Sequence, residues 1–115
     1  MKPVATLVMI AALGCGCSQR PDPMAVGNGP VVEIALRNFR FTMPDLEVSA
    51  GTIVRWRNET STFHTVSPDG HAAWQEFQSS SQGSTFDVAF AEPGTYAYFC
   101  VPHQALGMTG RIVVR

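Results

Sequence analysis

The chain has 115 residues, of which 45% are hydrophobic and 15% are charged, and its formal net charge is −1 at pH 7. This length is enough for one domain, and the composition is that of a globular core, which excludes a disordered or fibrous chain. A net charge so close to zero gives no electrostatic reason to expect nucleic acid or an anionic membrane surface as a partner.

The first 14 residues have the composition of a targeting segment. A minimal basic start, Met1-Lys2, precedes a short apolar run from Val4 to Leu13. A helix that crosses a bilayer needs about 20 apolar residues, so this run fits a secretory signal better than a membrane span. It ends at Ala11-Ala12-Leu13-Gly14-Cys15, which resembles the bacterial lipoprotein box. We therefore expect residues 1–14 to be removed and Cys15 to be acylated; an ordinary cleaved signal peptide is the alternative.

Residues 15–30 are typical of a flexible tether. Between Ser18 and Pro30 the chain has three Pro, two Gly and no apolar periodicity. We expect this lipid-anchored tether to carry a folded domain that spans residues 31–115. The expected location is the periplasmic or cell-surface side of a bacterial membrane, with the lipid as the only membrane contact.

Short strands account for most of residues 31–115. The segments 32–37 and 52–58 alternate with period two, and the second places Val54 and Trp56 on the face opposite Arg55 and Arg57. Further strands are expected at 46–49, 63–66, 85–90, 95–100 and 110–115. The span 71–84 is expected to hold a short helix and then a loop. About seven to eight strands predict an all-β fold, either an antiparallel sandwich or a Greek-key barrel.

The loop between the last two strands carries the chemistry. It reads Cys100-Val-Pro-His103-Gln-Ala-Leu-Gly-Met108 and so places a thiolate, an imidazole and a thioether between two apolar strands. These donors suit copper, and two His and one Cys in a plane with a distant Met form the blue-copper set. The second imidazole must come from elsewhere, and His64, at the edge of another strand, is the best candidate. The sequence therefore predicts a mononuclear copper centre that carries single electrons.

Two neighbours of these donors are expected to tune the centre. Thr65 follows His64, and either its backbone or its hydroxyl is placed to donate to the Cys100 thiolate; such bonds orient ligands and adjust the potential. Pro102 removes one N–H near the sulfur. His71, in Asp69-Gly70-His71, is expected to be a solvated loop residue.

With these motifs the sequence resembles the small blue-copper cupredoxins, most closely the plastocyanin and pseudoazurin branch. The resemblance rests on the Cys-x-Pro-His-x₄-Met loop and on His64-Thr65-Val66, and it covers residues 31–115. It implies a Greek-key β-sandwich, one copper ion per chain and the ligands His64, Cys100, His103 and Met108. Many family members have Asn where this chain has Thr65.

The resemblance also implies how electrons leave the protein. In the family the route is the exposed edge of the loop imidazole, here His103, within an apolar ring. The ring here would consist of Pro102, Ala105, Leu106 and Gly107. Such a small flat patch suits transient redox partners, because these encounters bury little surface. The resemblance further implies a monomer.

Four other interpretations remain open at this point. A cysteine enzyme would need an orienting carboxylate and an oxyanion site, and the loop has no acidic residue. A structural zinc site would want four Cys or His donors. A Cys17–Cys100 disulfide would tie the tether to the loop. A copper delivery or storage protein is the strongest rival, because it would use the same ligand types.

Overall fold

The computed structural model describes residues 28–115 of the chain. The predicted signal peptide, the predicted lipidation site Cys15 and most of the tether lie outside the described residues. The described part consists of nine strands and one 3₁₀ helix. These are β1 (Val31–Arg37), β2 (Arg40–Phe41), β3 (Asp45–Val48), β4 (Thr52–Asn58), β5 (His64–Asp69), β6 (Phe77–Ser79), β7 (Thr85–Phe90), β8 (Gly94–Phe99), η2 (Val101–Leu106) and β9 (Thr109–Val114).

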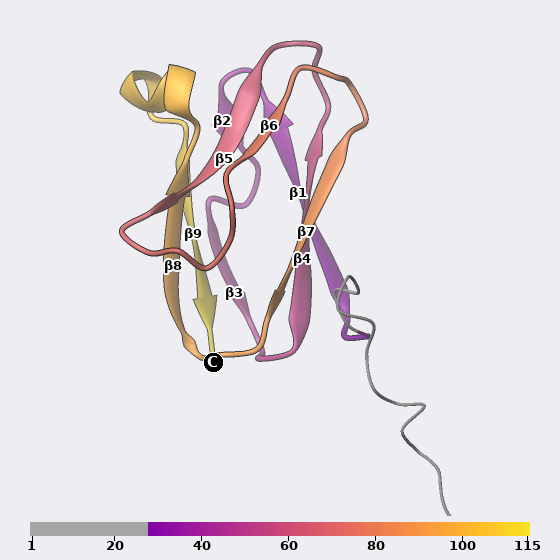
Figure 1. Cartoon of the computed structure of the whole chain (residues 1–115), viewed down its shortest axis with the longest axis vertical. Helices are drawn as coiled ribbons and strands as arrows, with labels where there is room; N and C mark the ends of the chain where they lie inside the picture. Colours follow the sequence, from indigo (N-terminus) through magenta and orange to yellow (C-terminus); the bar gives the residue numbers. More distant parts are fainter. Residues whose placement is uncertain (1–27) are drawn as a thin grey trace, which may run out of the picture.

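The strands form two sheets that pack face to face as a β-sandwich (Figure 1). One sheet has the strand order β2-β1-β4-β7, and the other has the order β3-β9-β8-β5-β6. Two of the strand pairs are parallel, β1 with β4 and β3 with β9, and the other pairs are antiparallel. The all-β sandwich is confirmed, but its sheets are mixed where an antiparallel sandwich was expected.

The core follows from the alternation along the strands. In β4, Val54 and Trp56 are fully buried, whereas Arg55 and Arg57 point to the outer face, as predicted. The Trp56 ring packs against Tyr98 of β8, with 5.3 Å between the ring centroids, and so joins the two sheets. Large aromatic rings bury much apolar area, so this contact is a major part of the core.

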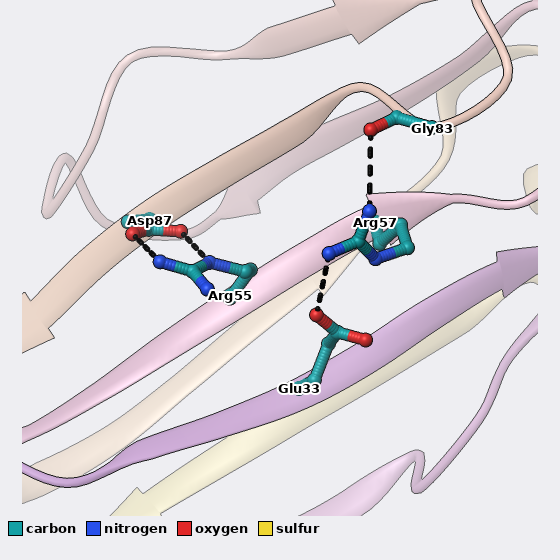
Figure 2. A network of polar contacts seen from close by, with 5 residues as sticks. All are labelled: Glu33, Arg55, Arg57, Gly83 and Asp87. Atoms are coloured by element: carbon teal, nitrogen blue, oxygen red, sulfur yellow. Dashed lines mark hydrogen bonds and ion pairs between the residues drawn. The ribbon is translucent and has the colours of Figure 1, made fainter.

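The outer face of the four-stranded sheet is held by charged pairs (Figure 2). Arg55 of β4 binds the Asp87 carboxylate of β7 through two nitrogens, each at 2.8 Å. Arg57 reaches Glu33 of β1 at 3.1 Å and the carbonyl of Gly83 at 3.4 Å. These cross-strand contacts tie β4 to both of its neighbours.

Two expectations about the elements need correction. Residues 28–115 contain nine strands where seven to eight were expected, because the two-residue β2 and the three-residue β6 are too short to show a period. The predicted helix within residues 71–84 is wrong. Trp74 instead packs on the core and donates from Nε1 to the carbonyl of Val66, and Phe77 begins β6, which pairs with β5.

One end of the sandwich gathers the residues that the sequence singled out. The helix η2 and the beginning of β5 lie at the same end, away from the C-terminus (Figure 1).

Within residues 28–115, no helix has the length and apolar character needed to cross a membrane.

Candidate metal centre

The loop between β8 and β9 is closed by its own backbone. Cys100 donates its N–H to the carbonyl of Met108 at 3.0 Å, and Met108 donates to the carbonyl of His103 at 3.3 Å. Pro102 lies in the first turn of η2, where a missing N–H leaves no unpaired donor. Gly107 ends the helix with a φ of 87°, a left-handed conformation that suits glycine. The loop therefore holds Cys100, His103 and Met108 in fixed relation.

This closed loop and β5 bring three of the predicted donors together. One nitrogen each from His64 and His103 and the sulfur of Cys100 all lie within 4.8 Å of one another. The Cys100 sulfur lies 3.3 Å from Nδ1 of His103 and 3.6 Å from Nδ1 of His64. Donors at such spacing can share one transition-metal ion, whose bonds to nitrogen and sulfur are about 2.0–2.3 Å long. Met108 is fully buried at the end of the same loop.

The orientation of the His64 ring is fixed by a residue that the sequence analysis missed. Nε2 of His64 lies 2.9 Å from Oδ1 of Asn38, in the turn between β1 and β2. An amide oxygen only accepts, so Nε2 carries the proton and the neutral ring presents the lone pair of Nδ1 toward Cys100. The separation of 26 positions between Asn38 and His64 explains why no local pattern predicted this contact.

The turn that leads into His64 is built around Asn58, which is fully buried at the end of β4. Its Oδ1 accepts from the backbone N–H and the hydroxyl of Thr60, at 2.9 and 2.8 Å. Its Nδ2 donates to the carbonyls of Thr62 and Ser79, at 3.3 and 3.2 Å. The Asn58 side chain therefore stabilises the turn that precedes His64.

The Cys100 sulfur accepts a hydrogen bond from the backbone of Thr65, with 3.4 Å between nitrogen and sulfur. The Thr65 hydroxyl oxygen instead accepts the N–H of Val101, at 2.8 Å. The sequence left open whether the backbone or the hydroxyl of Thr65 would reach the sulfur; the backbone does. Thr65 thus bonds β5 to the start of the Cys100–Met108 loop, at a position where many family members have Asn.

Burial also decides the protonation of the donors. It lowers the pKa of His64, and the charge of nearby His103 lowers it further, so the neutral, metal-binding form of His64 is favoured. Burial raises the pKa of the Cys100 thiol, and the hydrogen bond from the backbone of Thr65 acts in the opposite direction. A metal ion must therefore displace the thiol proton, and binding at this site releases a proton.

The surface above the site is apolar and centred on half-buried His103. Leu106 and Val101 are 64% and 52% exposed. The predicted ring members Pro102 and Ala105 are also exposed. The sequence analysis missed Phe39, which is 45% exposed and whose ring centroid lies 4.6 Å from that of His103. We call Phe39, Val101, Pro102, Ala105 and Leu106 the apolar rim.

His71 lies apart from this cluster and is more enclosed than a solvated loop residue. Its Nε2 lies 2.8 Å from the carbonyl of Ala97, and its Nδ1 accepts the N–H of Ala73 at 3.1 Å. Its ring packs edge-on against Trp74 and Tyr96. Both nitrogens are therefore engaged in tying residues 71–74 to β8.

The donor set fits copper better than other metals. A thiolate, two imidazoles and a buried thioether at one end of a β-sandwich combine soft and borderline donors, which copper prefers and which hard cations do not. A fold of two packed β-sheets with this cluster at the loop end defines the cupredoxin class.

Comparison with known proteins identifies the family. The family model described as copper binding proteins, plastocyanin/azurin family, matches residues 30–115. Amicyanin-alpha of Methylorubrum extorquens is 30% identical over 114 residues, which cover 96% of this chain and 92% of that protein. The major plastocyanin isoform of Arabidopsis thaliana is 28% identical, over 76% of this chain and 62% of that one.

Solved structures of amicyanin and plastocyanin have the same fold as this chain. A Cu(I) amicyanin variant superposes with a TM-score of 0.64 at 26% identity, over 78% of this chain and 86% of that chain. The oxidised plastocyanin of Dryopteris crassirhizoma shares the fold, with a TM-score of 0.59 at 23% identity, over 73% of this chain and 100% of that chain. The chain thus belongs to the plastocyanin/azurin family of copper-binding proteins, and its cofactor is one copper ion.

Proposed function

We propose that this chain is a type 1 (blue) copper protein that carries single electrons. Nδ1 of His64, Sγ of Cys100 and Nδ1 of His103 would bind the copper, and the Met108 thioether would be a further, weaker donor. The observation that carries the proposal is the cluster itself, in which these two nitrogens and the sulfur lie within 4.8 Å. The family membership supports the same assignment.

Bound copper supplies a one-electron couple between Cu(II) and Cu(I), which prefer different geometries. The chain's part is to hold the donors against rearrangement. Asn38 orients His64, the backbone of Thr65 donates to the sulfur, and the loop closes through Met108. His64, Cys100 and Met108 are all fully buried, which excludes water from the donors. A rigid dry site lets an electron move with little change of structure.

Electrons would enter and leave through the edge of His103. This ring is the one candidate ligand among His64, Cys100, His103 and Met108 that is not fully buried. The apolar rim around it offers a small surface, which suits brief contact with redox proteins. The protein would work as a monomer that meets one donor and one acceptor in turn.

The site of action would be outside the cytoplasm. The amino-terminal segment 1–14 has the pattern of a secretory signal, and Cys15 follows as a lipidation site. The acyl chain would hold the protein at the membrane surface on the periplasmic or cell-surface side, and residues 15–30 would let the copper domain reach its partners.

The test is a Cu(II) titration of the purified chain, followed by visible absorption and electron paramagnetic resonance. We expect one copper per chain, an intense visible band from charge transfer between thiolate and copper, narrow copper hyperfine splitting and reversible reduction. A colourless complex that gives up Cu(I) readily to a chelator would contradict the proposal and favour copper delivery or storage.

A further inference from the structure

A chain of hydrogen bonds leads from the metal centre to an exposed carboxylate at the surface. The Thr65 hydroxyl, which accepts the N–H of Val101, lies 2.8 Å from the hydroxyl of Ser67. Ser67 donates to Oε1 of Glu76 at 2.7 Å. Thr65 and Ser67 are both buried, whereas Glu76 is exposed. We call these three side chains the Thr65–Ser67–Glu76 relay.

The charge of Glu76 determines the direction of every bond in the relay. An ionised carboxylate only accepts, so the Ser67 hydroxyl must donate to it. The Ser67 oxygen then accepts the proton of the Thr65 hydroxyl, and the Thr65 oxygen keeps its lone pairs for Val101. Hydrogen bonds that run in one direction polarise one another, which makes Thr65 Oγ1 a stronger acceptor beside the Val101 amide.

The position of Glu76 is held from several sides. Gln78 donates to its second oxygen, Oε2, at 2.6 Å. Trp74 fastens the preceding residues to β5 through the carbonyl of Val66, and β6 pairs with β5 directly after Glu76. The hydrogen bonds from Gln78 and Ser67 lower the pKa of Glu76, so the carboxylate is ionised at neutral pH. The outer end of the relay is therefore a fixed negative charge.

The relay ends beside the metal centre. The negative charge of Glu76 at its outer end would favour Cu(II) over Cu(I), because the oxidised ion carries one more positive charge. Val101, whose amide ends the relay, directly follows Cys100 in the chain.

We propose that Glu76 is a positioning residue of the copper centre, whose carboxylate acts through Ser67 and Thr65 on the amide that follows Cys100 and holds the reduction potential down. This inference rests on the proposed function of the site and adds a means by which a surface charge adjusts it. None of the three relay side chains is a candidate copper ligand.

The experiment measures the reduction potential of copper-loaded variants. Glu76→Gln removes the charge and is expected to raise the potential while the visible band persists. Glu76→Asp keeps the charge on a side chain that is one methylene shorter, so we expect it to lose the bond to Ser67 and also to raise the potential. The matched control is Glu92→Gln, which removes an equal charge from a residue outside the relay and is expected to leave the potential near the wild-type value.

A double-mutant cycle separates the relay from direct action of the charge through space. In a Ser67→Ala background the hydroxyl chain is cut, and Glu76→Gln is expected to produce less than half of the shift that it produces alone. Equal shifts in both backgrounds would overturn the inference, and so would a wild-type potential in Glu76→Asp or an equal shift in Glu92→Gln.

The failure of this inference is distinguishable from the failure of the proposed function. Unchanged potentials in variants that keep the intense visible band would overturn the role of Glu76 alone. A wild-type chain that binds no copper in the blue form would overturn the proposed function, and the inference with it.

Discussion

The metal end of the sandwich and the outer face of the four-stranded sheet both depend on polar side chains, but in opposite ways. At the metal end, His64, Thr65 and Asn58 are nearly or fully buried, and each bonds to specific partners. On the outer face, the side chains of Arg55 and Arg57 are each 36% exposed and bind carboxylates across the strands (Figure 2).

This difference in burial indicates where a single substitution should have a large effect. A buried polar group has no water to replace a lost partner, so its removal leaves a donor or acceptor unpaired. An exposed pair exchanges its partner for water at little cost. We therefore expect substitutions at the metal end to change copper chemistry strongly, and substitutions on the outer face to change stability weakly.

The largest effect is expected for Cys100→Ser. A hydroxyl of similar size fits the site, but it cannot supply the thiolate that gives the visible band, so the band should disappear completely. Visible absorption after copper addition checks this, and the far-ultraviolet circular dichroism spectrum controls for folding. A retained intense band would mean that the sulfur is not a ligand.

The next effect is expected for Asn38→Leu, which removes the acceptor that fixes the His64 ring. Loss of such a supporting hydrogen bond typically lowers metal affinity by about 10–100-fold. A competition titration against a chelator measures the affinity. Asn38→Asp is the control because it keeps an acceptor oxygen, and equal affinities for the Leu and Asp variants would contradict the role of Asn38.

A smaller effect is expected for Met108→Leu. The side chains have similar volumes, so the buried site should stay packed and copper should stay bound. Loss of the weak thioether donor destabilises Cu(II) more than Cu(I), and the reduction potential should rise. Met43→Leu, on an exposed methionine, is the matched control. Equal potentials for Met108→Leu and the wild type would argue that the Met108 thioether is not a copper ligand.

The smallest effect is expected for Asp87→Asn on the outer face. The hydrogen bonds from Arg55 lower the pKa of Asp87 below its ordinary value of 3.8. The pair therefore contributes stability at neutral pH, and this contribution is lost as the pH falls through the lowered pKa. Urea unfolding at neutral pH should show a slightly lower midpoint for the variant, and the difference should vanish in strong acid and shrink in high salt.

Part of the fold and part of the candidate site could be predicted from the sequence alone. The strands over residues 52–58 and 85–90 were predicted with their observed bounds, because period-two alternation marks each strand locally. The loop from Cys100 to Met108 was equally readable, since its three candidate donors lie on one short segment. Local spacing was thus enough to predict the fold class and to propose most of the copper ligands.

The contacts that hold the donors were not readable in the same way. Asn38 lies 26 residues from His64, and Val101 lies 36 residues from the Thr65 hydroxyl that it binds. Only the packing of the two sheets brings these groups together. The short strand β6 was taken for part of a helix because three residues cannot display a period.

The turn around Asn58 has a consequence for recognising copper sites in other sequences. A search pattern limited to the Cys-x-x-His-x₄-Met loop describes only one of the two segments that form the candidate copper site. Here a buried Asn stands six positions before His64 and shapes the approach of the second segment. A pattern that joins this Asn-x₅-His spacing to the loop would describe both segments that form the candidate copper site of this chain.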